Sequence, residues 1–159
     1  KGGAPGEPVL KAFGNIRHAD AVLAGERELA RDETGRPVTG RDASGAPVER
    51  WVWRNPKRPV WPQADFIVGN PPFLGGKDLR ARLGDGYAAA LWAAHPHMPE
   101  SADFVLYWWD RAAELLTAKG TRLRRFGFVT TNSIAQVLQR RVLERHMRAK
   151  KPVSLVLAI

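Results

Sequence analysis

The chain contains no cysteine, so the sequence excludes disulfide bonds and metal sites built from thiolates. It also lacks any run of about 18 consecutive apolar residues, which a membrane-spanning helix requires. Its first residues, K-G-G-A-P-G-E-P, include neither a methionine nor an apolar stretch, so we expect no signal peptide. We expect a flexible lead-in at this end of a cytoplasmic protein, and the chain looks like a fragment of a longer one.

Acidic residues are scarce relative to basic ones. The sequence has 25 lysines and arginines against 16 aspartates and glutamates, which gives a net charge of +9. A basic surface suits a polyanionic partner, although arginine-rich bacterial proteins are common and charge alone identifies no partner. With 159 residues, of which 44% are hydrophobic, the chain is long enough to bury the core of one domain.

The most informative stretch is D-F-I-V-G-N-P-P-F, residues 65–73. Its apolar run ending in Gly69 is typical of a buried parallel strand, and ligands of open α/β sheets bind outside the carboxyl ends of such strands. The two prolines stiffen the backbone and push Asn70 into an extended conformation. The Asn70 carboxamide and the Asn70 and Pro71 carbonyls are then held as free acceptors, with Phe73 as a flat apolar plate. This arrangement suits a planar amine; the alternative is an ordinary turn.

Asn-Pro-Pro-Phe after a hydrophobic strand resembles motif IV of the S-adenosylmethionine-dependent N6-adenine DNA methyltransferases. Three wider segments are similar to the methyltransferase domain of fused bacterial restriction–modification enzymes, the MmeI-like group. They read N-P-P-F-L-G-G-K-D-L-R, S-A-D-F-V-L-Y-W-W-D-R-A and G-F-V-T-T-N-S-I. The resemblance covers residues 15–159 except for residues 26–63.

The resemblance implies an enzyme that uses S-adenosyl-L-methionine to methylate the N6 amine of an adenine flipped out of DNA, in a restriction–modification or phage-defence system. It assigns the catalytic site to Asn70, Pro71, Pro72 and Phe73, with Asn70 also contacting the cofactor. A nuclease and a target-recognition domain, fused or separate, are the expected partners besides DNA. Phe73 stands where the family often has tyrosine, so stacking is kept and a hydroxyl is lost.

Asp20 follows a short strand that we predict over residues 15–18. In the family, an acidic or polar residue after the third strand, motif III, accepts a hydrogen bond from the adenine of the cofactor, and Asp20 matches that position. The alternative is that Asp20 caps a turn over residues 21–25. We expect His18 to be an ordinary surface residue.

Residues 26–63 interrupt the α/β pattern with turn-forming sequences. Segments 37–41 and 47–54 have strand character, and we expect them to form a hairpin in which Gly45 takes a positive φ. Basic residues alternate here with tryptophans, a pattern that can follow a nucleic-acid backbone. The alternative is a solvated hairpin whose Trp51 and Trp53, on one strand face, pack against the edge of the domain.

A glycine pair, Gly75 and Gly76, follows the motif and predicts a mobile loop that lets the backbone approach a ligand. Lys77 and Arg80 come next, and they would contact DNA phosphates or else be solvated.

Helices are predicted over residues 78–83 and 87–94. His95 and His97 lie two positions apart in the loop that follows. Because no acidic cluster accompanies them in the sequence, we expect no metal site there.

The clearest helical pattern covers residues 101–118, with Ser101 as its N-cap and Asp103 in its first turn. A second, basic helix is predicted over residues 134–150. Its basic side chains either face solvent or add to a DNA footprint.

A strand is predicted over residues 125–131. Thr131 and Asn132 would then lie at its carboxyl end, on the same rim as Asn70, where we expect them to contact nucleic acid. Residues 153–159 predict a final apolar strand.

The predicted order is strand, insertion, strand, helix, strand, helix, strand. It indicates the α/β class: a Rossmann-like, doubly wound, mostly parallel sheet with a β-hairpin insertion. Residues 1–159 then resemble the C-terminal part of one methyltransferase catalytic domain, because residues 1–14 supply neither the family's glycine-rich cofactor loop nor its ribose-binding acid. We therefore expect the isolated chain to be inactive. The alternatives are a methyltransferase of RNA adenine or protein glutamine, or an inactive fragment that binds nucleic acid.

Overall fold

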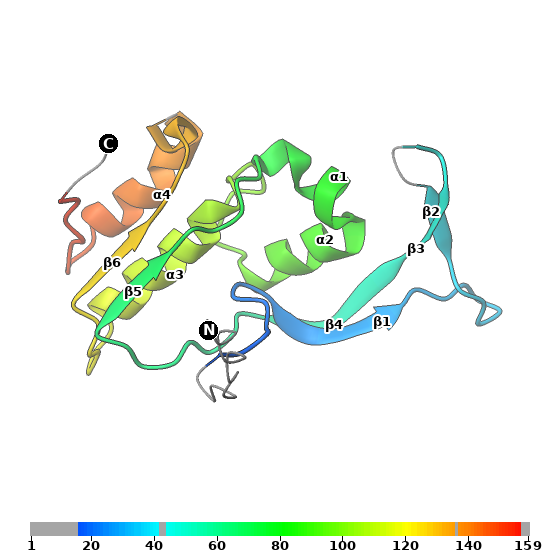
Figure 1. Cartoon of the computed structure of the whole chain (residues 1–159), viewed down its shortest axis with the longest axis horizontal. Helices are drawn as coiled ribbons and strands as arrows, with labels where there is room; N and C mark the ends of the chain where they lie inside the picture. The colour runs from blue at the N-terminus through cyan, green and yellow to red at the C-terminus, as the bar shows by residue number, and fades with distance from the viewer. Residues whose placement is uncertain (1–15, 42–43, 136, 157–159) are drawn as a thin grey trace, which may run out of the picture.

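The computed structural model describes residues 16–41, 44–135 and 137–156. Figure 1 shows two strands and two helices, β5, β6, α3 and α4, grouped at one side of the molecule. Helices α1 and α2 lie in the middle, and a long antiparallel ribbon formed by β1 and β4 extends away from them and ends in the small hairpin of β2 and β3. No helix in the described part of the chain is both long and apolar enough to cross a bilayer.

The parallel pair of β5 (Phe66–Gly69) and β6 (Arg125–Phe128) contains the motif strand. Phe66 is opposite Arg125 and Gly69 is opposite Phe128, so the two strands end together. Helix α3 covers one face of this pair, where the rings of Trp109 and Phe126 meet edge to face at 5.5 Å. On the other face, Phe66 and Val68 are 59% and 84% exposed. The parallel pairing confirms the α/β class, but the described residues form no doubly wound sheet, only three separate two-stranded sheets.

The first and last strands predicted along the chain are wrong for the residues that the structure describes. Residues 16–18 and 153–156 adopt no strand, while residues 15 and 157–159 lie outside the described part. A strand needs a neighbour for its backbone groups, and Ile16 is 74% exposed with no strand beside it. Val153 instead packs in the core and donates its N–H to the His146 carbonyl at 3.1 Å, so this segment follows α4.

The first two predicted helices are confirmed as α1 (Leu79–Leu83) and α2 (Asp85–Ala94), preceded by a 3₁₀ turn, η1 (Gly76–Asp78). Gly84 separates α1 from α2 with φ of 87°, a conformation that favours glycine.

Helix α3 (Val105–Thr117) begins later than predicted. Ser101 does not cap it, because residues 99–104 form turns in which the Ala102 N–H bonds to the Pro99 carbonyl at 2.9 Å. After β6, a 3₁₀ turn, η2 (Asn132–Ala135), precedes α4 (Val137–Met147), which is shorter than the predicted helix.

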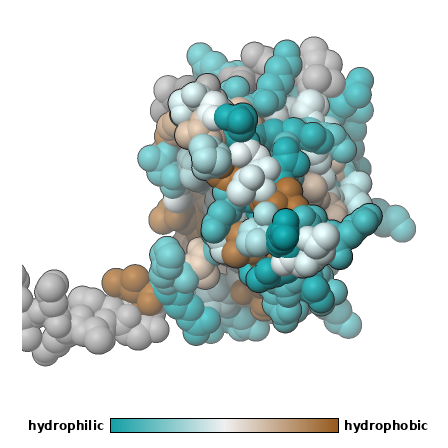
Figure 2. Space-filling view, turned by 90° about the vertical axis from the view of Figure 1, so that its right-hand side faces the viewer, coloured by the Kyte–Doolittle hydropathy of each residue, from teal (hydrophilic) through white to brown (hydrophobic). Residues whose placement is uncertain are grey.

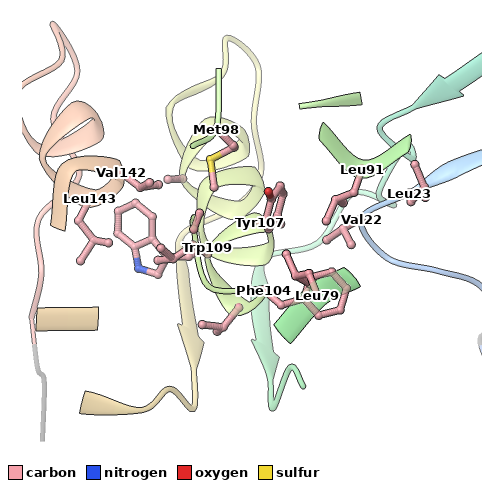
Figure 3. Packing of buried hydrophobic residues seen from close by; sticks show 14 of the residues in the cluster. Val22, Leu23, Leu79, Leu91, Met98, Phe104, Tyr107, Trp109, Val142 and Leu143 are labelled. Carbon is pink, nitrogen blue, oxygen red and sulfur yellow. The ribbon is translucent and has the colours of Figure 1, made fainter. Parts of the chain in front are cut away.

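The core is built around α3. Figure 3 shows Trp109 facing Val142 and Leu143 of α4 on one side, and Tyr107 facing Leu91 and the chain near Val22 on the other. Val22, Leu23, Leu79, Leu91 and Tyr107 are fully buried. The turn that contains Val22 and Leu23 is therefore anchored to α1, α2 and α3.

The insertion forms two antiparallel pairs. β2 (Thr39–Arg41) pairs with β3 (Pro47–Glu49), and Gly45 has φ of 84°, so the predicted hairpin is confirmed. Its continuation, β4 (Trp51–Lys57), pairs with β1 (Ala24–Leu29), a strand that the sequence did not predict. Viewed from the hairpin side, the surface is mostly hydrophilic, with small apolar patches (Figure 2).

Trp53 of β4 packs as the second interpretation predicted, whereas the ring of Trp51 is covered by the Arg27 guanidinium at 4.1 Å. Trp53 meets Tyr87 of α2 edge to face at 5.9 Å. Strand and helix approach so closely that a Cβ atom on Gly86 would lie 1.7 Å from the Trp51 carbonyl oxygen. The contact therefore holds the ribbon against α2.

Candidate functional site

The carboxyl ends of β5 and β6 form one edge. The Val129 N–H donates to the Gly69 carbonyl at 3.1 Å, directly beyond the last paired residues. Asn70, after β5, and Thr131, after β6, therefore leave the sheet at the same edge, as expected for parallel neighbours.

The Asn-Pro-Pro-Phe turn presents its polar and aromatic side chains to solvent. Pro71 is buried, whereas Asn70 and Pro72 are exposed, and no peptide bond among the described residues is cis. The Pro72 carbonyl accepts the Leu74 N–H at 3.1 Å, which tightens the turn and leaves Phe73 half exposed. No described residue binds the Asn70 carboxamide, so its oxygen is available to a ligand.

A pocket of about 220 Å³ opens beside Phe73. It is smaller than the roughly 300 Å³ at which pockets for drug-sized ligands begin, so it suits a single planar ring system. Its lining residues are Phe73, Leu74, Gly75, Asp103, Val105 and Thr131. The pocket brings together Phe73 and Thr131, which the sequence predicted, with Asp103 and Val105, which it did not predict as site residues.

A polar network holds the wall of this pocket. Asp103 Oδ1 accepts the Gly76 N–H at 3.2 Å and the Gln139 Nε2 amide at 3.1 Å. The Asp103 N–H donates to Gln139 Oε1 at 3.0 Å, and Gln139 Nε2 also donates to the Ser101 carbonyl at 3.2 Å. Because Gln139 is buried, α4 fixes both the start of α3 and the loop that follows Phe73.

Asp20 makes the hydrogen bonds of a turn cap. Its Oδ1 accepts the N–H groups of Val22 and Leu23 at 2.8 and 2.9 Å. Its Oδ2 accepts the Tyr87 hydroxyl at 2.6 Å. Burial, with the Asp20 carboxylate beside it, raises the pKa of Tyr87 far above its ordinary value, so Tyr87 donates as a neutral phenol.

Tyr87 also connects Asp20 to the pocket. Its ring meets Phe104 edge to face at 6.0 Å, and the Phe104 N–H donates to the Leu74 carbonyl at 2.8 Å. Asp20 is therefore linked through three contacts, by way of Tyr87 and Phe104, to Leu74, which lines the pocket.

The three other residues predicted to contact DNA, which are Lys77, Arg80 and Asn132, lie in different surroundings. Lys77 is exposed, with no carboxylate within 4 Å in the described part of the chain. The Arg80 guanidinium lies over the Trp92 ring at 4.9 Å and is 3.9 Å from Asp85, so it is already partly engaged. Asn132 is exposed at the start of η2 and does not line the pocket.

A second cluster surrounds Asp110, which is fully buried in α3. His97 and His146 bond to its two carboxylate oxygens through Nε2 at 2.8 and 2.6 Å, and Arg145 bonds to it as well. Burial favours the neutral acid, but the bonds from His146 and His97 and the charge of Arg145 hold the pKa of Asp110 well below its ordinary value.

Asp110 also completes a group with the residue types of a metal site. Ligand atoms of His95, His97 and Asp110 lie within 4.8 Å of one another, which the spacing in the sequence could not reveal. However, Arg145 already binds Asp110, the His95 Nε2 bonds to the Val22 carbonyl, and the His97 Nε2 bonds to Asp110. Because these groups already have partners, we propose no metal there.

The comparisons with known proteins agree with the motif. The family model for the MmeI DNA-methyltransferase domain matches residues 9–157. Searches of curated proteins and of solved structures found no match. The match spans nearly the whole chain and includes both strands whose ends form the pocket edge, so this chain belongs to the MmeI DNA-methyltransferase domain family.

Proposed function

We propose that this domain transfers a methyl group from S-adenosyl-L-methionine to the N6 amine of adenine in DNA, in a bacterial restriction–modification or phage-defence system. The observation that carries the proposal is that Asn70 and Phe73 follow the carboxyl end of β5, where Phe73 lines a pocket large enough for one base.

The target adenine, flipped out of the duplex, would occupy the pocket with its face on Phe73. The Asn70 side-chain oxygen and the Pro71 carbonyl would accept hydrogen bonds from the N6 amine. As this amine forms its new bond it becomes positively charged and tetrahedral, and fixed acceptors stabilise that state more than the planar starting amine. No general base is needed beforehand, because the amine proton becomes acidic only after the bond has formed.

S-adenosyl-L-methionine would supply an electrophilic methyl group. Asp20 fits a contact with the adenine amine of this cofactor, since an ionised carboxylate offers roughly four acceptor positions, and the Val22, Leu23 and Tyr87 donors occupy three of them. Asn70, which directly follows β5, would also contact the cofactor.

The remaining contacts would be made with DNA by Lys77, Arg80, Thr131 and Asn132. We further propose that the chain is the C-terminal part of a doubly wound catalytic domain whose other cofactor motifs come from sequence outside these 159 residues. The exposed Phe66 and Val68 support this, because both faces of a parallel sheet are normally covered. A nuclease and a target-recognition domain would complete the enzyme.

The proposal is tested by incubating the full-length enzyme, which carries all cofactor motifs, with labelled S-adenosyl-L-methionine and separate DNA, RNA and protein substrates. Label in N6-methyladenine after digestion of the DNA to nucleosides is the expected result. Label in RNA adenosine or in protein glutamine would show that RNA or protein, and not DNA, is the substrate. Binding of DNA without any transfer by the protein that carries all cofactor motifs would favour an inactive binding domain.

A further inference from the structure

We propose that a second, basic pocket, where the insertion meets α2 and α3, binds a phosphate group of the DNA backbone. The inference rests on the proposed function and adds a DNA contact at a place that the motif does not reach. The pocket has a volume of about 520 Å³. Its lining includes Lys57 and Arg58 from the insertion, Ala93 and Ala94 from α2, and Arg111 from α3.

The wall of this basic pocket carries positive charge in excess. Lys57, Arg58 and Arg111 line it, and no carboxylate does. Arg58 and Arg111 share one carboxylate, Glu114, at 2.6 and 3.3 Å. Among the described residues, no carboxylate lies within 4 Å of Lys57. Three cations and one neighbouring anion therefore leave a net charge of about +2, which suits a phosphate and disfavours a metal ion.

Hydrogen-bond donors also remain available at the pocket. Arg58 contacts both Glu114 oxygens through the same nitrogen, Nη1, at 2.8 and 2.6 Å. Its Nε and Nη2 groups bond to no other described residue. Arg111 adds positive charge to the wall, but its Nε is fully buried, and no described residue accepts its N–H. Guanidinium donors in a fixed planar arrangement match the several acceptor oxygens of a phosphate.

Helix α3 contributes one residue to each of the two pockets. Val105 lines the pocket beside Phe73 and Arg111 lines the basic pocket. Their six-residue separation is roughly 9 Å along the helix axis, and they point to different sides of the helix, so the two pockets lie farther apart than this rise. The bound phosphate would therefore belong to a nucleotide other than the target.

Binding at this place would also join two parts of the molecule. Lys57 and Arg58 belong to the end of the insertion ribbon, whereas Arg111 belongs to α3. A phosphate held by these residues would fix the ribbon relative to α3 and so to the edge formed by the carboxyl ends of β5 and β6.

The test compares Lys57→Gln with Lys119→Gln by titrating the protein with fluorescent duplex DNA at several salt concentrations. Both lysines are exposed, and Lys119 lines neither pocket. Loss of one phosphate contact lowers the slope of log affinity against log salt by about 0.9, so Lys57→Gln is expected to show that decrease and Lys119→Gln the wild-type slope. Equal slopes for Lys57→Gln and wild type would overturn the inference.

Two further measurements identify the ligand and distinguish a failure of this inference from a failure of the proposed function. Inorganic phosphate, titrated with detection by NMR, is expected to bind far more weakly than duplex DNA. Saturation of the pocket by inorganic phosphate, with DNA binding unaffected by Lys57→Gln, would assign the pocket to free phosphate and overturn the DNA contact. Failure of the wild-type protein to bind DNA at all would overturn the proposed function itself.

Discussion

The amide group of Gln139 holds both the main chain and the side chain of Asp103. Its Oε1 accepts the Asp103 N–H at 3.0 Å, and its Nε2 donates to Asp103 Oδ1 at 3.1 Å. Asp103 in turn accepts the N–H of Gly76. One buried side chain of α4 thus sets the position of the loop after Phe73.

Replacing Gln139 with leucine is expected to lower the free energy of unfolding by about 1–3 kcal/mol, because partners of the amide lose their bonds in a partly buried place. Methyl transfer by the full-length enzyme should fall as well, since the wall of the pocket beside Phe73 loosens. Urea unfolding measures the first effect. Arg141→Leu, on the exposed side of the same helix, is the control. If the two variants were equally stable, Gln139 would not hold the loop.

In the full-length enzyme, Asn70→Ala is expected to lower methyl transfer by about 10²–10³-fold, as for the loss of one acceptor that acts in the transition state. Cofactor affinity should stay nearly intact, because the main contact of Asn70 is with the target amine. Single-turnover rates and calorimetry measure the two quantities. Gln63→Ala removes an exposed carboxamide that lines neither pocket and should leave the rate unchanged. An Asn70→Ala rate within threefold of wild type would contradict the assignment.

Two substitutions of Asp20 separate its roles in the turn and with the cofactor. Asp20→Ala removes the acceptor of the Val22 and Leu23 N–H groups, so we expect a loss of about 0.5–2 kcal/mol in stability. Asp20→Asn can keep these bonds through its oxygen, and its N–H₂ group can donate to the Tyr87 hydroxyl, but it presents a donor where the adenine amine needs an acceptor. Cofactor affinity should then fall in both variants, by about 1–3 kcal/mol, while only Asp20→Ala loses stability. Unchanged cofactor affinity in Asp20→Asn would show that Asp20 acts only as the cap of the turn.

The neighbouring glycines Gly75 and Gly76 should respond differently to alanine. A Cβ atom on Gly76 would lie 2.4 Å from the Ser101 carbonyl carbon and oxygen, so the loop must move. On Gly75 its nearest neighbour would be Asp78 Oδ2 at 3.4 Å, an ordinary contact. We expect Gly76→Ala to cost about 1–3 kcal/mol and Gly75→Ala much less, measured as a difference in urea midpoint. Similar midpoints would show that the loop shifts freely.

His95 should make stability depend on pH. It is buried, donates from Nε2 to the Val22 carbonyl at 2.8 Å, and burial lowers its pKa below the ordinary 6.5. The unfolded chain therefore binds a proton more readily than the folded one, so the contribution of neutral His95 is complete above pH 6.5 and is lost as the pH falls through the folded pKa. His95→Gln should flatten the change in melting temperature between about pH 7 and pH 5. A change as steep as in wild type would assign the acid sensitivity to other groups.

Local patterns in the sequence predicted the edge of the site, but not its walls. Asn70 and Thr131 could be placed together because each follows an apolar strand and the ends of parallel strands meet. Gln139 carries no such signal, since its role depends on how α4 packs against the start of α3.

Strand predictions failed where pairing decides the structure. Residues 153–156 have a strand-like sequence but adopt no strand, and Val153 bonds to the end of α4 instead. β1, which reads A-G-E-R-E-L, has little strand pattern and forms because β4 pairs with it. Pairing partners far apart in the chain cannot be read from either segment alone.

The uncovered side of the parallel pair affects how the isolated chain should behave in solution. Among the described strands, β5 pairs only with β6, so the backbone groups along its other edge have no strand partner. Beside that open edge, Phe66 and Val68 offer apolar surface. An open edge next to exposed apolar side chains is a template for pairing with another molecule. The chain produced alone should therefore self-associate as its concentration rises, and a segment that adds a strand to β5 should keep it monomeric.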